Sequence, residues 1–174
     1  MSASAVPSLP YIIDVEASGF GRGSYPIEVG FIDPDGQTQA RLIHPLPDWQ
    51  HWSEDAEAIH GLSRADLLAQ GQPVKTVALW LNSQLQGQTV YSDSWGFDSS
   101  WLALLFDRAG MHQRFKVDAL ARLLNEAQLA VWEGYKQEVF RREGLVRHRA
   151  ADDASALQQT LRLIWAAGCA KTPV

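Results

Sequence analysis

Five residues of the chain have side chains and spacing suited to binding divalent cations. They are Asp14 and Glu16 in the run YIIDVEASGF, Asp98 in SWGFDSSWL, Asp153 in HRAADDASAL, and His148 five residues before Asp153. Carboxylates that share a site repel one another, and each raises the pKa of the others. Divalent metal ions are the usual means of neutralising such a cluster. The order and spacing therefore predict a two-metal site that acts on phosphodiester bonds.

The surrounding sequence places these carboxylates at the ends of strands or the starts of helices. Asp14 and Glu16 end an apolar run, and residues i and i+2 of a strand point to the same face. Asp98 opens a predicted helix, and Asp152 and Asp153 begin the last one. Each has an ordinary alternative, because acidic residues are common at solvated strand ends and aspartate often caps a helix. All four positions could converge on one edge of a sheet, which favours a site.

The periodicity of apolar residues predicts an α/β fold with a mixed sheet. Strands are predicted at residues 10–16, 26–32, 38–44, 88–92 and 114–119. Helices are predicted at residues 74–86, 97–109, 118–128, 130–142 and 154–167, with short helical pieces between 45 and 72. Short connections make the first three strands an antiparallel meander, and the later alternation with helices predicts parallel strands. We therefore expect a five-stranded sheet with helices on both faces.

Length and composition describe an ordinary globular protein. The chain has 174 residues, of which 46% are hydrophobic and 20% charged. We expect a flexible tail at residues 1–9 and one domain at residues 10–174. No apolar run approaches the roughly 20 residues of a membrane helix, and the first residues lack the pattern of a secretory signal. The single Cys169 agrees with a reducing compartment, so we expect a cytoplasmic protein that does not contact membranes.

Charge and aromatic content bear on the binding of nucleic acid. The net charge of −5 argues against a large, non-specific binder of duplex DNA, but bound metals would add positive charge at a local site. The residues near His148 include Arg141, Arg142, Arg147 and Arg149, which could guide a phosphate backbone or form a solvated basic face. The seven tryptophans could fill the core, and exposed ones could stack on bases.

Taken in order, these motifs resemble the DEDDh 3′–5′ exonucleases, the proofreading-exonuclease group of the ribonuclease H-like superfamily. The resemblance is carried by D-V-E at 14–16, P-I-E-V-G-F at 26–31, A-I-H-G-L-S-R-A-D-L at 58–67, F-D-x-x-W-L at 97–102 and H-R-A-x-x-D at 148–153. It covers about residues 10–168. It implies a ribonuclease H-like fold, with residues 10–174 as a single exonuclease domain.

The same resemblance implies roles for the matching residues. Two Mg²⁺ or Mn²⁺ ions would be held by Asp14, Glu16, Asp98 and Asp153. His148 would act as the general base, a role that suits imidazole near neutral pH. The 3′-terminal nucleotide would be received by Ser18, Phe20 and His60. The implied reaction releases nucleoside 5′-monophosphates from the 3′ ends of single-stranded DNA or RNA, and the implied protein is a monomer or a homodimer.

The chain departs from the family pattern at two positions. Asp93 stands where a neutral polar residue is usual, so it could alter metal preference or face away from the site. Ala17 lacks the hydroxyl group that often follows the glutamate. A second reading treats the chain as a catalytically weak or inactive module that binds nucleic acid or protein on the same fold. A third treats the acidic residues as caps and strand ends of an unrelated α/β protein, which leaves the ordered motifs unexplained.

Overall fold

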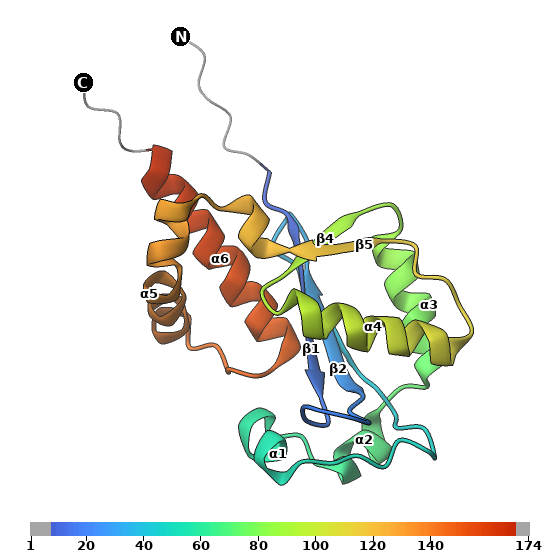
Figure 1. The fold of residues 1–174 in the computed structure, drawn as a ribbon. Coiled ribbons are helices and arrows are strands. Elements are labelled where there is room, and N and C mark those ends of the chain that lie inside the picture. The colour runs from blue at the N-terminus through green and yellow to red at the C-terminus, as the bar shows by residue number, and fades with distance from the viewer. Residues whose placement is uncertain (1–7, 170–174) are drawn as a thin grey trace, which may run out of the picture.

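A five-stranded sheet with the strand order β3-β2-β1-β4-β5 forms the centre of the molecule (Figure 1). The computed structural model describes residues 8–169, so most of the expected flexible tail lies outside the described residues. The strands are β1 (Tyr11–Ala17), β2 (Pro26–Ile32), β3 (Thr38–Leu42), β4 (Thr89–Ser92) and β5 (Lys116–Ala119). β1, β2 and β3 pair antiparallel, whereas β4 pairs parallel with both β1 and β5. The predicted mixed sheet is confirmed.

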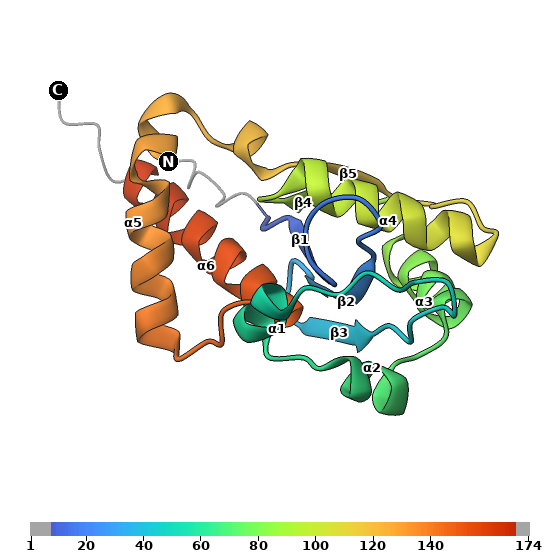
Figure 2. The same cartoon turned by 60° about the horizontal axis from the view of Figure 1, so that its bottom comes forward.

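Two pairs of helices cover the two faces of the sheet. The helices are α1 (Glu54–His60), α2 (Arg64–Gln70), α3 (Val74–Leu85), α4 (Trp95–Ala109), α5 (Glu126–Glu143) and α6 (Ala150–Cys169). Helices α3 and α4 lie on one side of the sheet and α5 and α6 on the other, while α1 and α2 lie beyond the end of β1 (Figures 1 and 2). No helix within residues 8–169 is long and apolar enough to cross a membrane.

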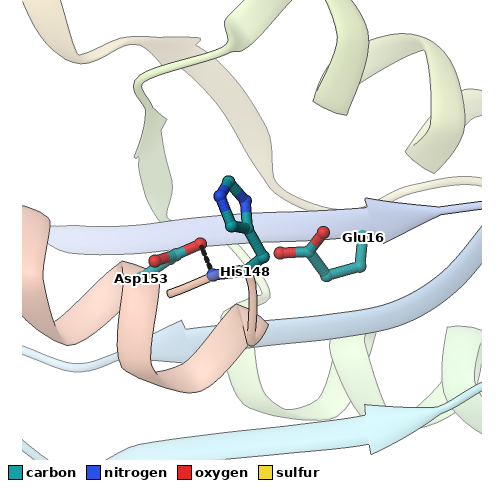
Figure 3. Close-up of side chains that lie close together, drawn as sticks. All are labelled: Glu16, His148 and Asp153. Atoms are coloured by element: carbon teal, nitrogen blue, oxygen red, sulfur yellow. Dashed lines mark hydrogen bonds between the residues drawn. The ribbon is translucent and has the colours of Figure 1, made fainter. Parts of the chain in front are cut away.

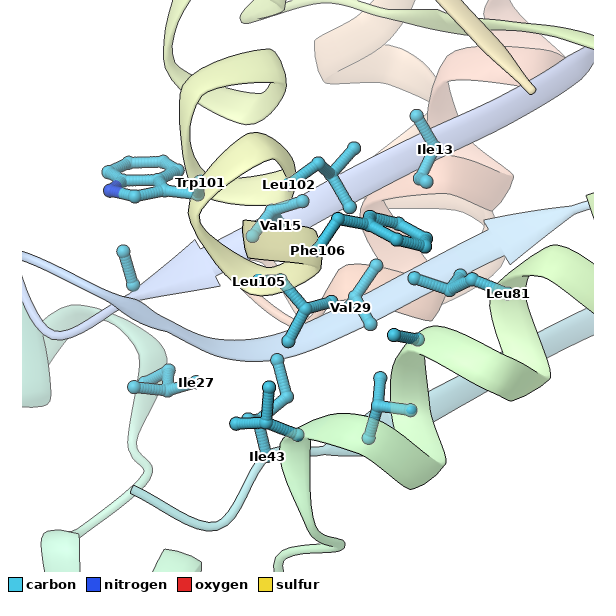
Figure 4. Packing of buried hydrophobic residues seen from close by; sticks show 14 of the residues in the cluster. Ile13, Val15, Ile27, Val29, Ile43, Leu81, Trp101, Leu102, Leu105 and Phe106 are labelled. Carbon is cyan, nitrogen blue, oxygen red and sulfur yellow. The ribbon is translucent and has the colours of Figure 1, made fainter. Parts of the chain in front are cut away.

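The alternation of side chains along β1 separates the two cores and orients the acidic residues. Ile13 and Val15 pack with residues of α3 and α4 in the larger core (Figure 4), whereas Ile12 packs with residues of α6. Because alternate residues of a strand share a face, Asp14 and Glu16 lie on the same side as Ile12. The strand therefore presents both carboxylates toward the start of α6, and its apolar residues fix that orientation.

The predicted helix at residues 118–128 is wrong. Residues 116–119 form β5, and Leu120–Leu123 form a 3₁₀ turn. Asn125 then caps α5, because its side chain accepts from the Gln128 amide while the Gln128 side chain accepts from the Asn125 amide. This reciprocal capping box starts a new helix at Glu126 and so ends any continuous helix through this region. The predicted helix at 130–142 is therefore part of a longer helix.

Two helix starts matter for the site. α4 begins at Trp95, so Asp98 lies in its first turn rather than opening it. α6 begins at Ala150, four residues before the predicted start, and its first turn contains Asp152 and Asp153. Carboxylates near a helix N-terminus interact favourably with the helix dipole. Both helices thus present an aspartate at the end that faces the C-terminal half of β1.

Candidate active site

All five residues predicted to act in catalysis or metal binding line one cavity of about 610 Å³. Asp14 and Glu16 come from β1, Asp98 from α4, and His148 and Asp153 from the start of α6 and the loop before it. The parallel strands β1 and β4 bring the chain to this edge of the sheet, which is where open α/β folds form sites. The fold therefore brings together side chains that are up to 139 residues apart in the sequence.

The two carboxylates of β1 lie where the strand becomes irregular. The register of β1 with β2 shifts between Glu16 and Ala17, as in a β-bulge. Oδ2 of Asp14 is buried and has no hydrogen-bond partner within the described residues. A buried carboxylate oxygen without a donor is costly unless a cation or water satisfies it. Asp14 thus has a free oxygen ligand inside the protein.

Asp98 enters the cavity from the first turn of α4 and is 1% exposed. The Ser92 hydroxyl, at the end of β4, donates to Oδ2 of Asp98 at 2.5 Å. This bond fixes the side chain relative to the sheet and leaves Oδ1 without a partner from Ser92. Strand β4 and helix α4 are joined by a two-residue connection, so the local sequence alone places this carboxylate beside the C-terminal end of β4.

Asp153 and His148 form a compact unit with Glu16 (Figure 3). The main-chain N–H of His148 donates to Oδ2 of Asp153 at 2.9 Å. One ligand atom from each of the three residues lies within 4.8 Å of the others, so the three could hold a metal ion. His148 has a φ angle of 60°, the left-handed conformation that non-glycine residues seldom adopt. The imidazole is exposed to solvent at the cavity.

Burial, together with mutual repulsion, makes these carboxylates harder to ionise. Burial raises the pKa of Asp14 well above its usual value, and the charges of Asp98, Glu16 and Asp153 add to this shift. Burial and the charge of Asp153 raise the pKa of Glu16 to about 8. Burial raises the pKa of Asp98 to about 7, against the hydrogen bond from Ser92. Burial also raises the pKa of Asp153 to about 6. The cluster therefore holds protons near neutral pH unless a cation replaces them.

The residues fit divalent metal ions. The donors are carboxylate oxygens, which Mg²⁺ and Mn²⁺ prefer, and one of them is a buried oxygen without a partner. Burial, and after it the neighbouring negative charges, raise the pKa values of Asp14 and Glu16, and bound cations would stabilise the ionised carboxylates. His148 adds a nitrogen at the edge of the same group. The assignment of individual residues as metal ligands stays a prediction.

Three aromatic side chains form a cluster on one wall of the cavity, defined by Phe20, Phe97 and Trp101. The ring centroids are 5.1 Å apart for Phe20 and Phe97, 6.0 Å for Phe20 and Trp101, and 5.7 Å for Phe97 and Trp101. Phe20 is 69% exposed and Phe97 is 54% exposed. Exposed aromatic faces beside an anionic site are suited to stacking on nucleobases.

His60 also lines the cavity but is 6% exposed. Its Nδ1 accepts from the Leu62 amide at 3.1 Å, so the neutral ring carries its proton on Nε2. Burial lowers the pKa of His60, which favours this neutral form. Nε2 is buried and has no hydrogen-bond partner within the described residues, although the ring lies near the Ala17 backbone and lines the cavity.

Ser18 does not have the position expected of a substrate-binding residue. It is fully buried and is not among the residues that line the cavity. Its hydroxyl accepts from the Tyr25 amide at 3.2 Å and lies 3.0 Å from Nδ1 of His51. These bonds hold the loop after β1, so Ser18 acts on the shape of that loop. The neighbouring Gly19 and Phe20 line the cavity instead.

The unusual Asp93 lines the cavity and forms an ion pair. Lys136 of α5 places Nζ 3.1 Å from Oδ2 of Asp93 and 3.0 Å from Oε2 of Glu133. The side chain of Lys136 is 19% exposed, so this charge is partly shielded from water. The extra negative charge of Asp93 is therefore partly offset by a cation that Glu133 shares. Asp93 does not face away from the site, and its charge, after burial, helps to raise the pKa of Asp98.

The four arginines near His148 have different surroundings. Arg147 lines the cavity, with its guanidinium carbon 4.6 Å from the ring centroid of Phe140. Arg149 pairs with Glu28 of β2 at 2.9 Å. Arg141 pairs with Glu138 on the exposed face of α5 at 2.5 Å, and Arg142 is exposed. The sequence predicts that these arginines either guide a phosphate backbone or form a solvated basic face. The position of Arg147 agrees with contact to a phosphate, whereas Arg141 belongs to a solvated face.

Several residues of the cavity could not be singled out from the sequence. Phe97 and Trp101 lie in the second motif, but a sequence pattern does not separate an exposed aromatic ring from a core one. Lys136 and Phe140 lie on a helix of low hydrophobicity with no motif. Their positions depend on how α5 packs against α6. The sequence signal that could identify Phe97 is its place directly before Asp98.

The fold and the cavity define an α/β domain with a carboxylate cluster at the C-terminal ends of parallel strands. No family model matches the chain, and no curated protein sequence matches it. Solved structures share its fold. The zinc-bound form of an E. coli exonuclease I complex with single-stranded DNA has a TM-score of 0.68 at 15% sequence identity, over 94% of this chain and 41% of that one.

Two further structures give the same picture. E. coli exonuclease I in complex with a dA16 oligonucleotide has a TM-score of 0.67 at 16% identity, over 90% of this chain and 40% of that one. Exonuclease I from Methylocaldum szegediense has a TM-score of 0.66 at 15% identity, over 91% of this chain and 40% of that one. The chain thus spans about two fifths of the length of these proteins. The likeness confirms the expected ribonuclease H-like fold.

Proposed function

We propose that this protein is a metal-dependent 3′–5′ exonuclease that hydrolyses single-stranded DNA or RNA and releases nucleoside 5′-monophosphates. The observation that carries the proposal is the convergence of four carboxylates and one histidine, distant in sequence, on one cavity. Similarity in fold to exonuclease I supports it, since two of the similar structures are complexes with a single strand or an oligonucleotide. Fold alone does not define a function, so the site carries more weight.

The carboxylates would hold the metal ions. Asp14, Glu16, Asp98 and Asp153 would bind two Mg²⁺ or Mn²⁺ ions. When bound, such ions lower the pKa of the attacking water and stabilise charge on the phosphate and the leaving oxygen. The raised pKa values support this role, because the carboxylates are costly to ionise in the metal-free protein and a bound cation would stabilise their ionised form.

His148 would act as the general base. Its imidazole lies at the cavity, with a nitrogen within 4.8 Å of carboxylate oxygens of Glu16 and Asp153. A histidine that is exposed at a cavity can take a proton from water and pass it to solvent. The backbone bond from His148 to Asp153 fixes the distance between this base and the carboxylates without using either ring nitrogen.

The walls of the cavity would receive the 3′-terminal nucleotides. Phe20, Phe97 and Trp101 would stack on bases, which favours single strands and gives little sequence preference. The Nε2–H group of His60 would donate to a sugar or phosphate oxygen. Arg147, which lines the cavity from the loop before α6, would contact the phosphate backbone.

The test uses DNA and RNA oligonucleotides labelled at the 5′ end. With Mg²⁺ or Mn²⁺, we expect stepwise shortening from the 3′ end with nucleoside 5′-monophosphates as products, and EDTA should stop it. Asp14→Asn should abolish most of this activity. Asp35→Asn is the matched control, because Asp35 is exposed in a turn outside the cavity and should leave the rate unchanged.

The products distinguish the alternatives. Release of the 5′-labelled mononucleotide as the first product would indicate that cleavage begins at the 5′ end. A protein that binds the oligonucleotides without shortening them, under both ions, would support the reading as an inactive binding module. Either result would contradict the proposed function.

A further inference from the structure

The loop at residues 144–149 joins α5 to α6 and carries His148. Two main-chain amides of this loop donate hydrogen bonds to side chains in the first turn of α6. The Val146 N–H donates to Oδ2 of Asp152 at 2.9 Å, and the His148 N–H donates to Oδ2 of Asp153 at 2.9 Å. His148 is the one non-glycine residue with a positive φ angle in residues 8–169. Such a conformation persists only where the surrounding structure holds it.

A third carboxylate holds this loop from the sheet. Glu28 of β2 accepts from Nη2 of Arg149 at 2.9 Å, from Nε of Arg149 at 3.2 Å, and from the Ala150 amide at 3.1 Å. The residue is 3% exposed, so its charge is removed from water and matched by the guanidinium. A bidentate pair fixes the plane of both groups. The two residues that follow His148 are thereby attached to β2.

Gly30 allows this attachment. A Cβ atom at Gly30 would lie 2.7 Å from the carbonyl carbon of Ala150 and 2.7 Å from the nitrogen of Ala151. Since Glu28 and Gly30 are two residues apart in β2, they present the same face to the start of α6. One strand therefore supplies both the close approach and the carboxylate that anchors the segment beside His148.

We propose that Glu28 is a positioning residue that, through Arg149 and the Ala150 amide, holds His148 at the cavity. The proposal rests on the proposed function, in which His148 is the general base. Glu28 differs from the four proposed metal ligands in that it does not line the cavity, and three donors already occupy its two oxygens. Its oxygens therefore bind the loop directly, and its charge also adds to the effect of burial in raising the pKa of Asp14 and Glu16.

The alternative is that the Glu28–Arg149 pair serves stability alone. A buried ion pair can hold a fold together without any effect on a nearby base. The two roles differ in their consequences. A base displaced by about 1 Å can cost up to about 100-fold in rate, while substrate binding is unchanged. A loss of stability alone would leave the rate of the remaining folded protein unchanged.

The kinetic test compares Glu28→Gln with His148→Ala and with the double variant. We expect Glu28→Gln to lower kcat about 10-fold to 100-fold, the range found when the partners that orient site residues are removed. KM for the oligonucleotide should change by less than about 3-fold, because the variant leaves the cavity wall intact. The double variant should have a kcat less than about 3-fold below that of His148→Ala. If Glu28 acts through His148, its substitution has little further effect once the imidazole is gone.

Two variants serve as controls. Arg149→Met removes the bidentate pair from the other side and keeps the aliphatic packing of a side chain that is 41% exposed. Arg149→Met should lower kcat as much as Glu28→Gln does. Arg149→Lys keeps the positive charge, so its kcat should lie between those of Arg149→Met and the wild-type protein. Asp48→Asn breaks another bidentate pair, with Arg108, outside the cavity lining, and should leave kcat unchanged.

Amide hydrogen exchange measures the attachment without any reaction. Glu28→Gln and Arg149→Met should each speed exchange of the His148 and Ala150 amides at least about 10-fold while the central strands stay protected. If the wild-type protein has no exonuclease activity but exchange accelerates as expected, the proposed function fails and the structural attachment stands. Two results would overturn the role of Glu28. One is unchanged exchange at these amides, and the other is a double variant whose loss of kcat equals the product of the losses of Glu28→Gln and His148→Ala.

Discussion

The main-chain N–H of His148 donates a 2.9 Å hydrogen bond to Oδ2 of Asp153, so the proposed base and a proposed metal ligand form one linked unit. The bond uses the backbone of His148 and leaves its imidazole free. Removing the ring therefore does not remove the bond. This relationship separates the chemical role of the side chain from the shape of the site, and mutation can test the two independently.

His148→Ala should lower kcat by about 100-fold to 10,000-fold, the usual contribution of a general base. The affinity for Mn²⁺, measured by isothermal titration calorimetry, should change little, because the four carboxylates remain. Thermal unfolding should stay near that of the wild-type protein, since the imidazole is exposed. A variant that keeps full activity would contradict the role of His148, and one that loses Mn²⁺ affinity as well would make it a metal ligand.

The stability of the metal-free protein should fall as the pH rises. In the folded protein the pKa is about 6 for Asp153, about 7 for Asp98 and about 8 for Glu16, whereas unfolded carboxyl groups titrate near 4. The folded state thus binds protons more tightly than the unfolded state, and this proton binding adds to the free energy of unfolding. The added stability is fully present below about pH 4 and is lost as the pH rises through 6 to 8.

We expect the Tm measured in EDTA to fall between pH 5 and pH 8.5 by several degrees, as expected for a change of about 1–3 kcal/mol in a domain of this size. Mn²⁺ should raise the Tm most at the upper end of that range, where the carboxylates are ionised. Asp14→Asn should raise the Tm in EDTA and reduce the rise caused by Mn²⁺. A Tm that increases with pH in EDTA would show that these carboxylates are not crowded together.

Phe20→Ala should weaken the binding of single-stranded oligonucleotides. Phe20 is 69% exposed and completes the cluster with Phe97 and Trp101. Loss of stacking on one base costs about 1–3 kcal/mol, so the Kd should rise about 5-fold to 150-fold. Fluorescence anisotropy with an oligonucleotide in the Asp14→Asn background measures this without cleavage.

Leu79→Ala is the control for this experiment. Leu79 is 52% exposed on α3 and does not line the cavity, so its removal should leave the Kd unchanged. Equal effects of the two substitutions would indicate that general exposed hydrophobicity drives binding, and no effect of Phe20→Ala would remove the aromatic cluster from the binding surface.

Local patterns in the sequence predicted the sheet and the cavity carboxylates. The apolar alternation around Ile13 and Val15 fixes β1, and the same period places Asp14 and Glu16 on one face. The order of motifs placed Asp98, His148 and Asp153 at matching positions, and they line the same cavity. Periods of two and 3.6 residues are local properties, so they are visible without knowledge of the packing.

Contacts between distant segments could not be predicted in this way. Glu28 and Arg149 are 121 residues apart, and their pairing depends on how α6 lies on β2. The match of Lys136 to Asp93 depends likewise on the packing of α5. The burial of Ser18 follows from the path of the loop after β1. The capping box at Asn125 is a local signal for the start of α5, but the segment before it mixes helical and strand patterns, which obscures the helix boundary.

The most direct test of the metal site is anomalous X-ray scattering from crystals soaked with Mn²⁺ and a nucleoside 5′-monophosphate. We predict two Mn²⁺ peaks in the cavity, coordinated by carboxylate oxygens of Asp14, Glu16, Asp98 and Asp153, with the phosphate between His148 and the ions. Well-ordered crystals that show this cavity without Mn²⁺, or with Mn²⁺ bound only elsewhere on the surface, would contradict the proposed two-metal site.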